Sequence, residues 1–129
     1  MSCHDHPVDP ERVEAVRAGG LTATHAEQFA RLARVLADPL RGRILAALLV
    51  SDEMCVGDLA LALDANEDAV SYALRRLRTA GLVHRRRDGR MGYYRLRDGA
   101  ARAIAAVVNR LRELSEVGSE SSTGDRADA

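Results

Sequence analysis

Possible metal ligands are grouped at two places in this chain of 129 residues. Cys3, His4 and His6 stand within four residues of one another near the N-terminus. Cys55 and Asp58 stand three residues apart in a predicted short helix, where their side chains would share one face. Thiolate with imidazole suits tetrahedral zinc, and sets richer in thiolate favour cadmium or lead. We therefore expect a divalent metal ion (Zn, Cd or Pb) as effector, held by Cys3, Cys55 and one or both histidines, with Asp58 as a weaker ligand.

Two other interpretations of the cysteines stay open. A single cysteine on a helix is usually a small buried apolar residue, and Cys55 would then only contribute to packing. Alternatively, Cys3 and Cys55 form a thiol redox switch, in which peroxide rather than metal is the signal and both N-terminal histidines are dispensable. The N-terminal group of ligands favours the metal interpretation over simple packing, and the response to peroxide or metal would decide between the two switches.

Arginine is concentrated in one stretch of the chain. Nine arginines and one aspartate lie between Arg75 and Arg97, although the formal net charge of the whole chain is zero. Arginine binds phosphate and can read guanine through two hydrogen bonds. The predicted contacts to double-stranded operator DNA are Ser71, Tyr72, Arg75 and Arg76 in the major groove, and Arg85, Arg86, Arg87 and Arg90 on phosphate or in the minor groove. Glu67 and Asp68 would repel phosphate there, so they either contact cytosine amines or cap the helix and point away.

The apolar periodicity and the turn residues predict a mainly α (α+β) winged helix-turn-helix. Asn66 is a good N-cap, Gly81 a helix stop, and Asp88-Gly89 a hairpin turn. In chain order we expect helices over 24–37, 39–49, 52–63 and 67–80, strands over 82–87 and 92–97, and a helix over 100–114. Three regions follow: a flexible metal-binding arm (1–20), a DNA-binding and dimerisation domain (21–116), and a disordered tail (117–129).

Three segments together resemble the ArsR/SmtB family of metal-responsive repressors. They are Leu36-Ala-Asp-Pro-Leu-Arg-Gly-Arg-Ile-Leu45, the helix and its stop from Ala69 to Val83, and the hairpin Asp88-Gly-Arg-Met-Gly-Tyr-Tyr-Arg-Leu96. The resemblance covers roughly residues 25–115. It implies a homodimer that represses a metal export or sequestration gene and leaves its operator when metal binds.

Within that family, Glu53-Met-Cys-Val-Gly-Asp-Leu-Ala60 most resembles the zinc, cadmium and lead sensors of the SmtB/CadC branch. In those sensors the cysteine of this segment binds metal together with Cys or His of the N-terminal arm, usually from the other protomer. Gly57 and Asp58 match the zinc-type pattern, whereas the lead- and cadmium-type sensors carry a second cysteine at the position of Gly57.

The last helix departs from the family. Many relatives hold a second metal site there, with Asp near its start and His further along. Asp98 is retained, but Ala100, Leu111 and Leu114 stand where its partners would be. The resemblance therefore implies that the site at Cys55 alone performs the regulation.

The remaining expectations concern other function classes. No apolar run approaches the roughly 20 residues of a membrane span, and no signal peptide precedes the domain. We expect a cytoplasmic regulator with no membrane partner and no small-molecule substrate. An enzyme finds no support, because no glycine-rich phosphate loop or nucleophile arrangement is recognisable.

Overall fold

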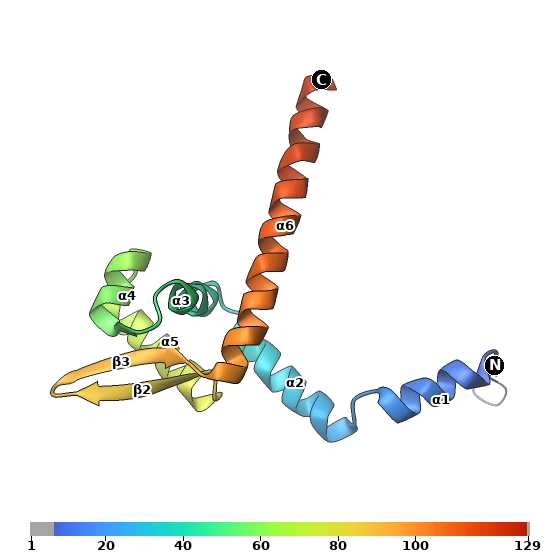
Figure 1. The fold of residues 1–129 in the computed structure, drawn as a ribbon, viewed down its shortest axis with the longest axis horizontal. Helices are drawn as coiled ribbons and strands as arrows, with labels where there is room; N and C mark the ends of the chain where they lie inside the picture. The colour runs from blue at the N-terminus through green and yellow to red at the C-terminus, as the bar shows by residue number, and fades with distance from the viewer. Residues whose placement is uncertain (1–6, 129) are drawn as a thin grey trace. The chain divides into compact units, whose positions relative to one another are not determined.

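The computed structural model describes the backbone of residues 7–128 and the side chains of residues 7–116. Its elements are α1 (Pro10–Gly19), α2 (Ala23–Leu36), α3 (Pro39–Val50), β1 (Met54–Cys55), α4 (Val56–Leu63), α5 (Glu67–Thr79), β2 (Val83–Asp88), β3 (Met91–Leu96) and α6 (Asp98–Asp128) (Figure 1). The chain divides into two compact units between Arg34 and Val35.

The first unit contains α1 and most of α2, and neither helix has a buried residue. Asp9 caps α1 by accepting a hydrogen bond from the amide of Arg12 at 3.1 Å. Pro10 at the first helical position is compatible with this start, because that position needs no amide donor. The arm expected to be flexible over residues 1–20 therefore contains a helix in its described part.

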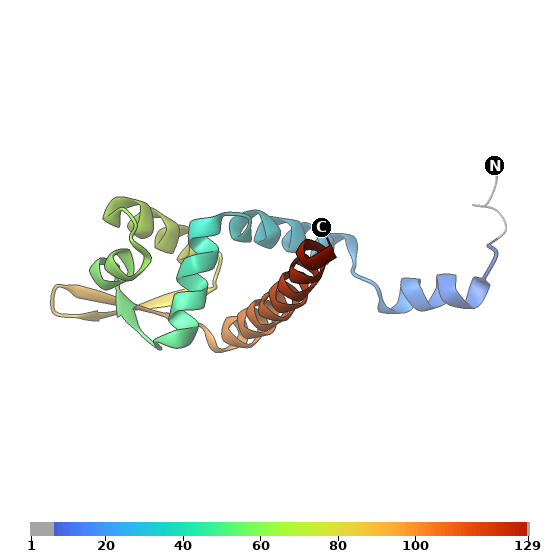
Figure 2. The same cartoon turned by 90° about the horizontal axis from the view of Figure 1, so that it is seen from above.

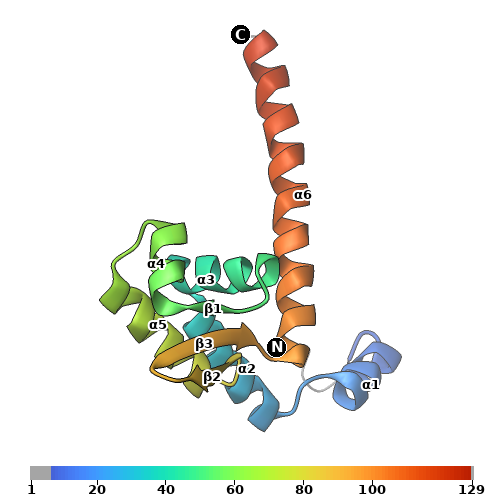
Figure 3. The same ribbon diagram turned by 60° about the vertical axis from the view of Figure 1, so that its left-hand side comes forward.

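The second unit is built around one apolar core. Figure 3 shows the helices and the three-stranded sheet that contribute to it. The described residues include no buried polar or charged side chain. The core consists of Ile44, Leu45, Leu48, Leu59, Ala60, Val70, Ala73, Leu74, Leu77, Leu82, Val83, Leu96 and Ile104. Helices α3, α4 and α5, both hairpin strands and the start of α6 all contribute to it, so the winged helix-turn-helix predicted from the sequence is confirmed.

Local hydrogen bonds fix where α5 begins and ends. The Asn66 side chain accepts from the amide of Ala69 at 3.1 Å, as expected for an N-cap. After α5, Gly81 takes a φ of +79°, a conformation that glycine adopts without a steric penalty.

A side chain also connects two helices of the domain. Arg43 of α3 donates a hydrogen bond to the carbonyl of Leu63 at 2.9 Å, which ties the end of α4 to α3.

The sheet has three antiparallel strands in the order β1-β3-β2. The hairpin is confirmed, but its two-residue turn is Gly89-Arg90 rather than Asp88-Gly89, because Asp88 still pairs with Met91. Gly89 has a φ of +63°, which suits the first central position of a tight hairpin turn.

The helix expected over 52–63 is shorter than the sequence indicates. Met54 and Cys55 form β1, which pairs with Tyr94 and Tyr93, and α4 begins only at Val56. Pairing with β3 satisfies the backbone groups that a helix would otherwise use. Cys55 therefore has an extended backbone and occupies the N-cap position of α4.

Helix α6 begins beside α3, as Figure 2 shows, and continues to Asp128. The sequence places its end near Leu114 and predicts a disordered tail over 117–129, because the apolar stripe stops there. Val107, Leu111 and Leu114 are exposed, and an apolar cavity of about 550 Å³ lies between α3 and α6. In the described part of the chain, no helix is both long and apolar enough to cross a membrane.

The cap of α5 leads to a stability prediction. Asn66→Ala removes the acceptor for the Ala69 amide and should lower the free energy of unfolding by about 1 kcal/mol. Urea unfolding measures this change. Asn66→Asp keeps a capping oxygen and should stay near wild type; equal losses in both variants would contradict the assignment.

Candidate nucleic-acid interface and sensory segment

An open groove of about 710 Å³ lies between α5, the start of α4 and the hairpin. Four arginines line it, Arg75 and Arg78 from α5 with Arg85 and Arg90 from the hairpin, and all four are exposed. Glu67 is the one acidic residue in its lining. The complete lining is Cys55, Val56, Gly57, Glu67, Ser71, Arg75, Arg78, Thr79, Arg85, Arg90, Met91, Gly92 and Tyr94. Such a groove favours a polyanion.

Helix α5 presents its polar residues in two rows. Ser71, Arg75 and Arg78 follow one another at helical spacing and line the groove. Tyr72 and Arg76 form a neighbouring row outside the groove lining, and Arg76 donates a 3.5 Å hydrogen bond to the Tyr72 hydroxyl. The Tyr72 side chain is large and apolar in part, yet the residue is 52% exposed. Burial of the opposite stripe leaves both rows facing outward.

Gly92 makes room for one of the groove arginines. A Cβ atom at this position would lie 2.7 Å from Nε of Arg85, closer than a real contact allows. The arginine side chain thus crosses the backbone of β3 where only a hydrogen projects. Thus the missing side chain at position 92 helps Arg85 reach the groove.

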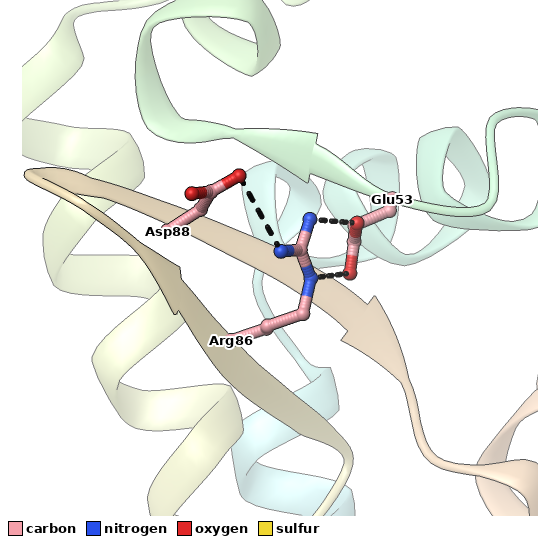
Figure 4. Close-up of polar contacts among 3 residues, drawn as sticks. All are labelled: Glu53, Arg86 and Asp88. Atoms are coloured by element: carbon pink, nitrogen blue, oxygen red, sulfur yellow. Dashed lines mark hydrogen bonds and ion pairs between the residues drawn. The ribbon is translucent and has the colours of Figure 1, made fainter.

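Arg86 is held differently from the groove arginines. Its Nη2 and Nε donate to the two carboxylate oxygens of Glu53 at 2.7 and 3.1 Å (Figure 4). Its guanidinium carbon lies 4.9 Å from the centre of the Tyr93 ring, and Nη1 lies 3.8 Å from Asp88. The hydrogen bond from Arg86 holds the pKa of Glu53 below its ordinary value, and the same bond raises the pKa of Arg86.

Cys55 lies in the groove wall. It is 7% exposed and stands opposite Tyr93 in the β1–β3 pairing, but it is not part of the main core cluster. Asp58, three positions later, is exposed. Cys55 and Asp58 were expected to share one face of a helix, but Cys55 precedes the helix as its N-cap. Asp58 is the third residue of α4, and an N-cap side chain lies near that position.

The other predicted metal ligands, Cys3, His4 and His6, lie outside the described residues. Within the described ranges, no three Cys, His, Asp or Glu side chains are gathered as a metal site would require. Of the predicted DNA contacts, Ser71, Arg75, Arg85 and Arg90 meet in the groove. Arg87 is exposed on β2, away from the groove lining.

Sequence reasoning missed three residues that this geometry brings forward. Arg78 continues the row from Ser71 and Arg75, and its spacing was a usable signal. Glu53 and Tyr93 bind Arg86 across the sheet, Glu53 from 33 residues away and Tyr93 from the neighbouring strand of the hairpin. Only the strand register reveals that contact.

Comparison with known proteins identifies the family. Residues 38–85 match the family described as "Bacterial regulatory protein, arsR family". Over 114 residues the chain is 40% identical to a "Transcriptional repressor SmtB homolog" of Synechocystis sp., covering 88% of this chain and 81% of that protein. The chain belongs to the ArsR/SmtB family. The family expected from the sequence motifs is confirmed, and the relatives are transcriptional regulators rather than enzymes.

Two further similar proteins are informative. "Cadmium resistance transcriptional regulatory protein CadC" of Listeria innocua is 38% identical over 61 residues, covering 47% of this chain and 51% of that protein. A solution structure from Mycobacterium bovis, described as a homodimeric winged helix-turn-helix DNA-binding domain, has a TM-score of 0.65 at 33% identity. The matched region covers 76% of this chain and 94% of the Mycobacterium bovis chain.

The Glu53–Arg86 pair leads to a prediction about protonation. Its contribution to stability is present above the ordinary pKa of a glutamate and is lost as pH falls through the lowered pKa of Glu53. Arg86→Met should therefore raise the pKa of Glu53 toward its ordinary value, as followed by carboxyl carbon NMR shifts on metal-free protein. Arg87→Met, the neighbouring control, should leave it unchanged. An unaltered Glu53 titration in Arg86→Met would show that the pair does not form.

Proposed function

We propose that the protein is a transcriptional repressor that binds operator DNA as a metal-free dimer and is released by a divalent soft metal ion of the Zn, Cd or Pb class. Membership of the ArsR/SmtB family supports the repressor role. The observation that carries the DNA-binding proposal is the groove between α5 and the hairpin, with four exposed arginines in its lining. Zinc, cadmium or lead resistance or efflux genes are the proposed targets.

The two rows of α5 divide the DNA contacts between them. A recognition helix lies in the major groove. We place one strand of the DNA backbone in the groove between that helix and the wing. Ser71, Arg75 and Arg78 face this backbone from the helix, and Arg85 and Arg90 face it from the hairpin. Arg87 adds a phosphate contact from the wing. Tyr72 and Arg76 reach base edges, where an arginine discriminates guanine by about 1–3 kcal/mol.

The exposed stripe of α6 supports a homodimer. Val107, Leu111 and Leu114 are all more than half exposed. Val107 and Leu111 line the apolar cavity between α3 and α6, and Leu114 lies one turn beyond Leu111. A second copy would cover this surface and gain its burial free energy. The homodimeric state described for the Mycobacterium bovis domain agrees with this arrangement. Two copies present two recognition helices to a palindromic operator.

The metal proposal rests on donor chemistry. Cys55 supplies a buried thiol at the start of α4, and Asp58 an exposed carboxylate one turn into that helix. Cys3, His4 and His6 would complete the set from the N-terminal arm of either protomer, giving the thiolate and imidazole ligands that suit zinc or cadmium. The name of the Listeria relative, a cadmium resistance regulator, points in the same direction.

The bound metal would act as a cross-link between the arm and the start of α4. The protein's own residues then convert that link into a change of DNA affinity, because Cys55 lies between α4 and β3 and next to the groove arginines. A changed angle between the two recognition helices prevents both from fitting adjacent major grooves. Couplings of this kind typically amount to about 1–3 kcal/mol.

The metal switch is tested on the full chain by fluorescence anisotropy with a duplex selected from a randomised pool. Saturating zinc or cadmium should weaken binding about 5- to 150-fold, as that coupling range implies. Metal-free Cys55→Ser should bind the duplex with wild-type affinity. Its affinity should not change when metal is added, because a hydroxyl is a poor ligand for these ions. Unchanged affinity with zinc, cadmium and lead would refute the metal switch. Release by peroxide instead, independent of His4 and His6, would establish the thiol redox alternative.

The backbone contacts are tested by salt dependence. Each lost phosphate contact should reduce the slope of log K against log salt concentration by about 0.9. We expect this reduction for Arg75→Ala and for Arg90→Ala in the metal-free protein. Arg102→Ala, on the exposed surface of α6, is the control and should keep the wild-type slope. Wild-type slopes in the groove variants would refute the proposed path of the DNA.

A further inference from the structure

One row of side chains crosses the whole sheet. Cys55 on β1 stands opposite Tyr93 on β3, and Tyr93 stands opposite Arg86 on β2. Directly opposed residues of antiparallel strands have side chains on the same face, with Cβ atoms about 4.5–5.5 Å apart. Glu53 stands two positions before Cys55, on the same face, and its carboxylate closes the row by binding Arg86.

The guanidinium of Arg86 is already committed within the protein. Two of its nitrogens bind the two oxygens of Glu53, the third lies 3.8 Å from Asp88, and the Tyr93 ring lies against its face. Because Glu53 binds Nε and Nη2 and compensates the positive charge, a phosphate would meet a paired guanidinium here rather than a free cation. Among the described residues, the four groove arginines form no ion pair, so they remain available to an anion.

The row joins two parts of the protein that otherwise meet through few bonds. Strand β1 has only two residues, whereas β2 and β3 have six each and form the wing. Arg86 reaches from the far edge strand, across β3, to the residue that precedes β1. The row thus fixes the outer wing strand to the segment that carries Cys55 and opens α4.

We propose that Glu53, Tyr93 and Arg86 form a strut that positions the wing relative to Cys55, and that this strut carries the effect of a ligand at Cys55 to the groove arginines. Arg86 is then a positioning residue and not the phosphate contact that its place among the wing arginines predicts. This inference rests on the proposed function, because it assigns the path by which Cys55 affects DNA binding.

The two roles of Arg86 predict opposite effects of a change at its partner. If Arg86 contacts phosphate, Glu53→Gln frees its charge and strengthens DNA binding. If Arg86 belongs to the strut, Glu53→Gln and Arg86→Met each loosen the wing and weaken binding by a similar factor, and the double variant is no weaker than either single variant. Such non-additivity is the signature of two residues that act as one unit.

The experiment measures the affinity of the full chain for the selected duplex, with and without zinc, at several salt concentrations. For Glu53→Gln, Arg86→Met and the double variant we expect a wild-type salt slope and a several-fold loss of affinity. The ratio of the dissociation constant with zinc to that without zinc should fall toward 1. Arg90→Met is the matched control, with no carboxylate partner among the described residues. It should lower the slope by about 0.9 and retain the zinc ratio.

Three results overturn the strut: tighter DNA binding by Glu53→Gln, a slope reduced in Arg86→Met as in Arg90→Met, or additive losses in the double variant. Thermal unfolding of each variant checks that the fold is retained. A wild-type protein that ignores zinc would instead refute the metal switch of the proposed function, while the metal-free slopes and the double-variant comparison still decide the role of Arg86.

Discussion

Burial of the apolar stripe of α5 is the constraint on which the rest of this structure depends. Val70, Leu74 and Leu77 are fully buried against α3, α4 and the sheet. A helix so fixed cannot rotate without exposing these side chains, at a cost of about 1.5–3 kcal/mol for each one. The polar rows on its other side are therefore held at a set angle to the hairpin. The groove exists because the core dictates which face of α5 remains outside.

Charge is arranged around the groove so that a neutral protein still offers a cationic surface. The formal net charge is zero, yet the groove lining carries four arginines and a single acid. Glu67, that acid, stands in the first turn of α5, where a carboxylate interacts favourably with the helix dipole. The positive end of the helix dipole thereby offsets part of the negative charge of Glu67. The local excess of positive charge, not the total, governs which partners approach this face.

Local sequence signals predict much of this fold, and fail where structure depends on distant residues. Asn66 marks the start of α5 and Gly81 follows its end, as their residue types predict. Capping and left-handed conformations depend on single residues, so the local sequence is enough to predict them. The short strand at Met54 could not be predicted, since a two-residue strand exists only by pairing with β3. The partner of Arg86 is 33 residues away, so its charge looks available in the sequence and is neutralised in the fold. For the same reason a run of arginines overstates the number of cations open to DNA.

The position of Cys55 gives a physical reason for proposing a sensory role for this residue. As the last residue of β1 and the N-cap of α4, it belongs to the sheet and the helix-turn-helix at once. The cap makes no side-chain hydrogen bond, so a ligand on the thiol need not break one to bind. This junction connects α4, which leads into α5, with Tyr93 of the wing strand β3. A residue buried deeper in the core would move neither without disrupting packing, and one on the exposed face of α4 would contact only that helix.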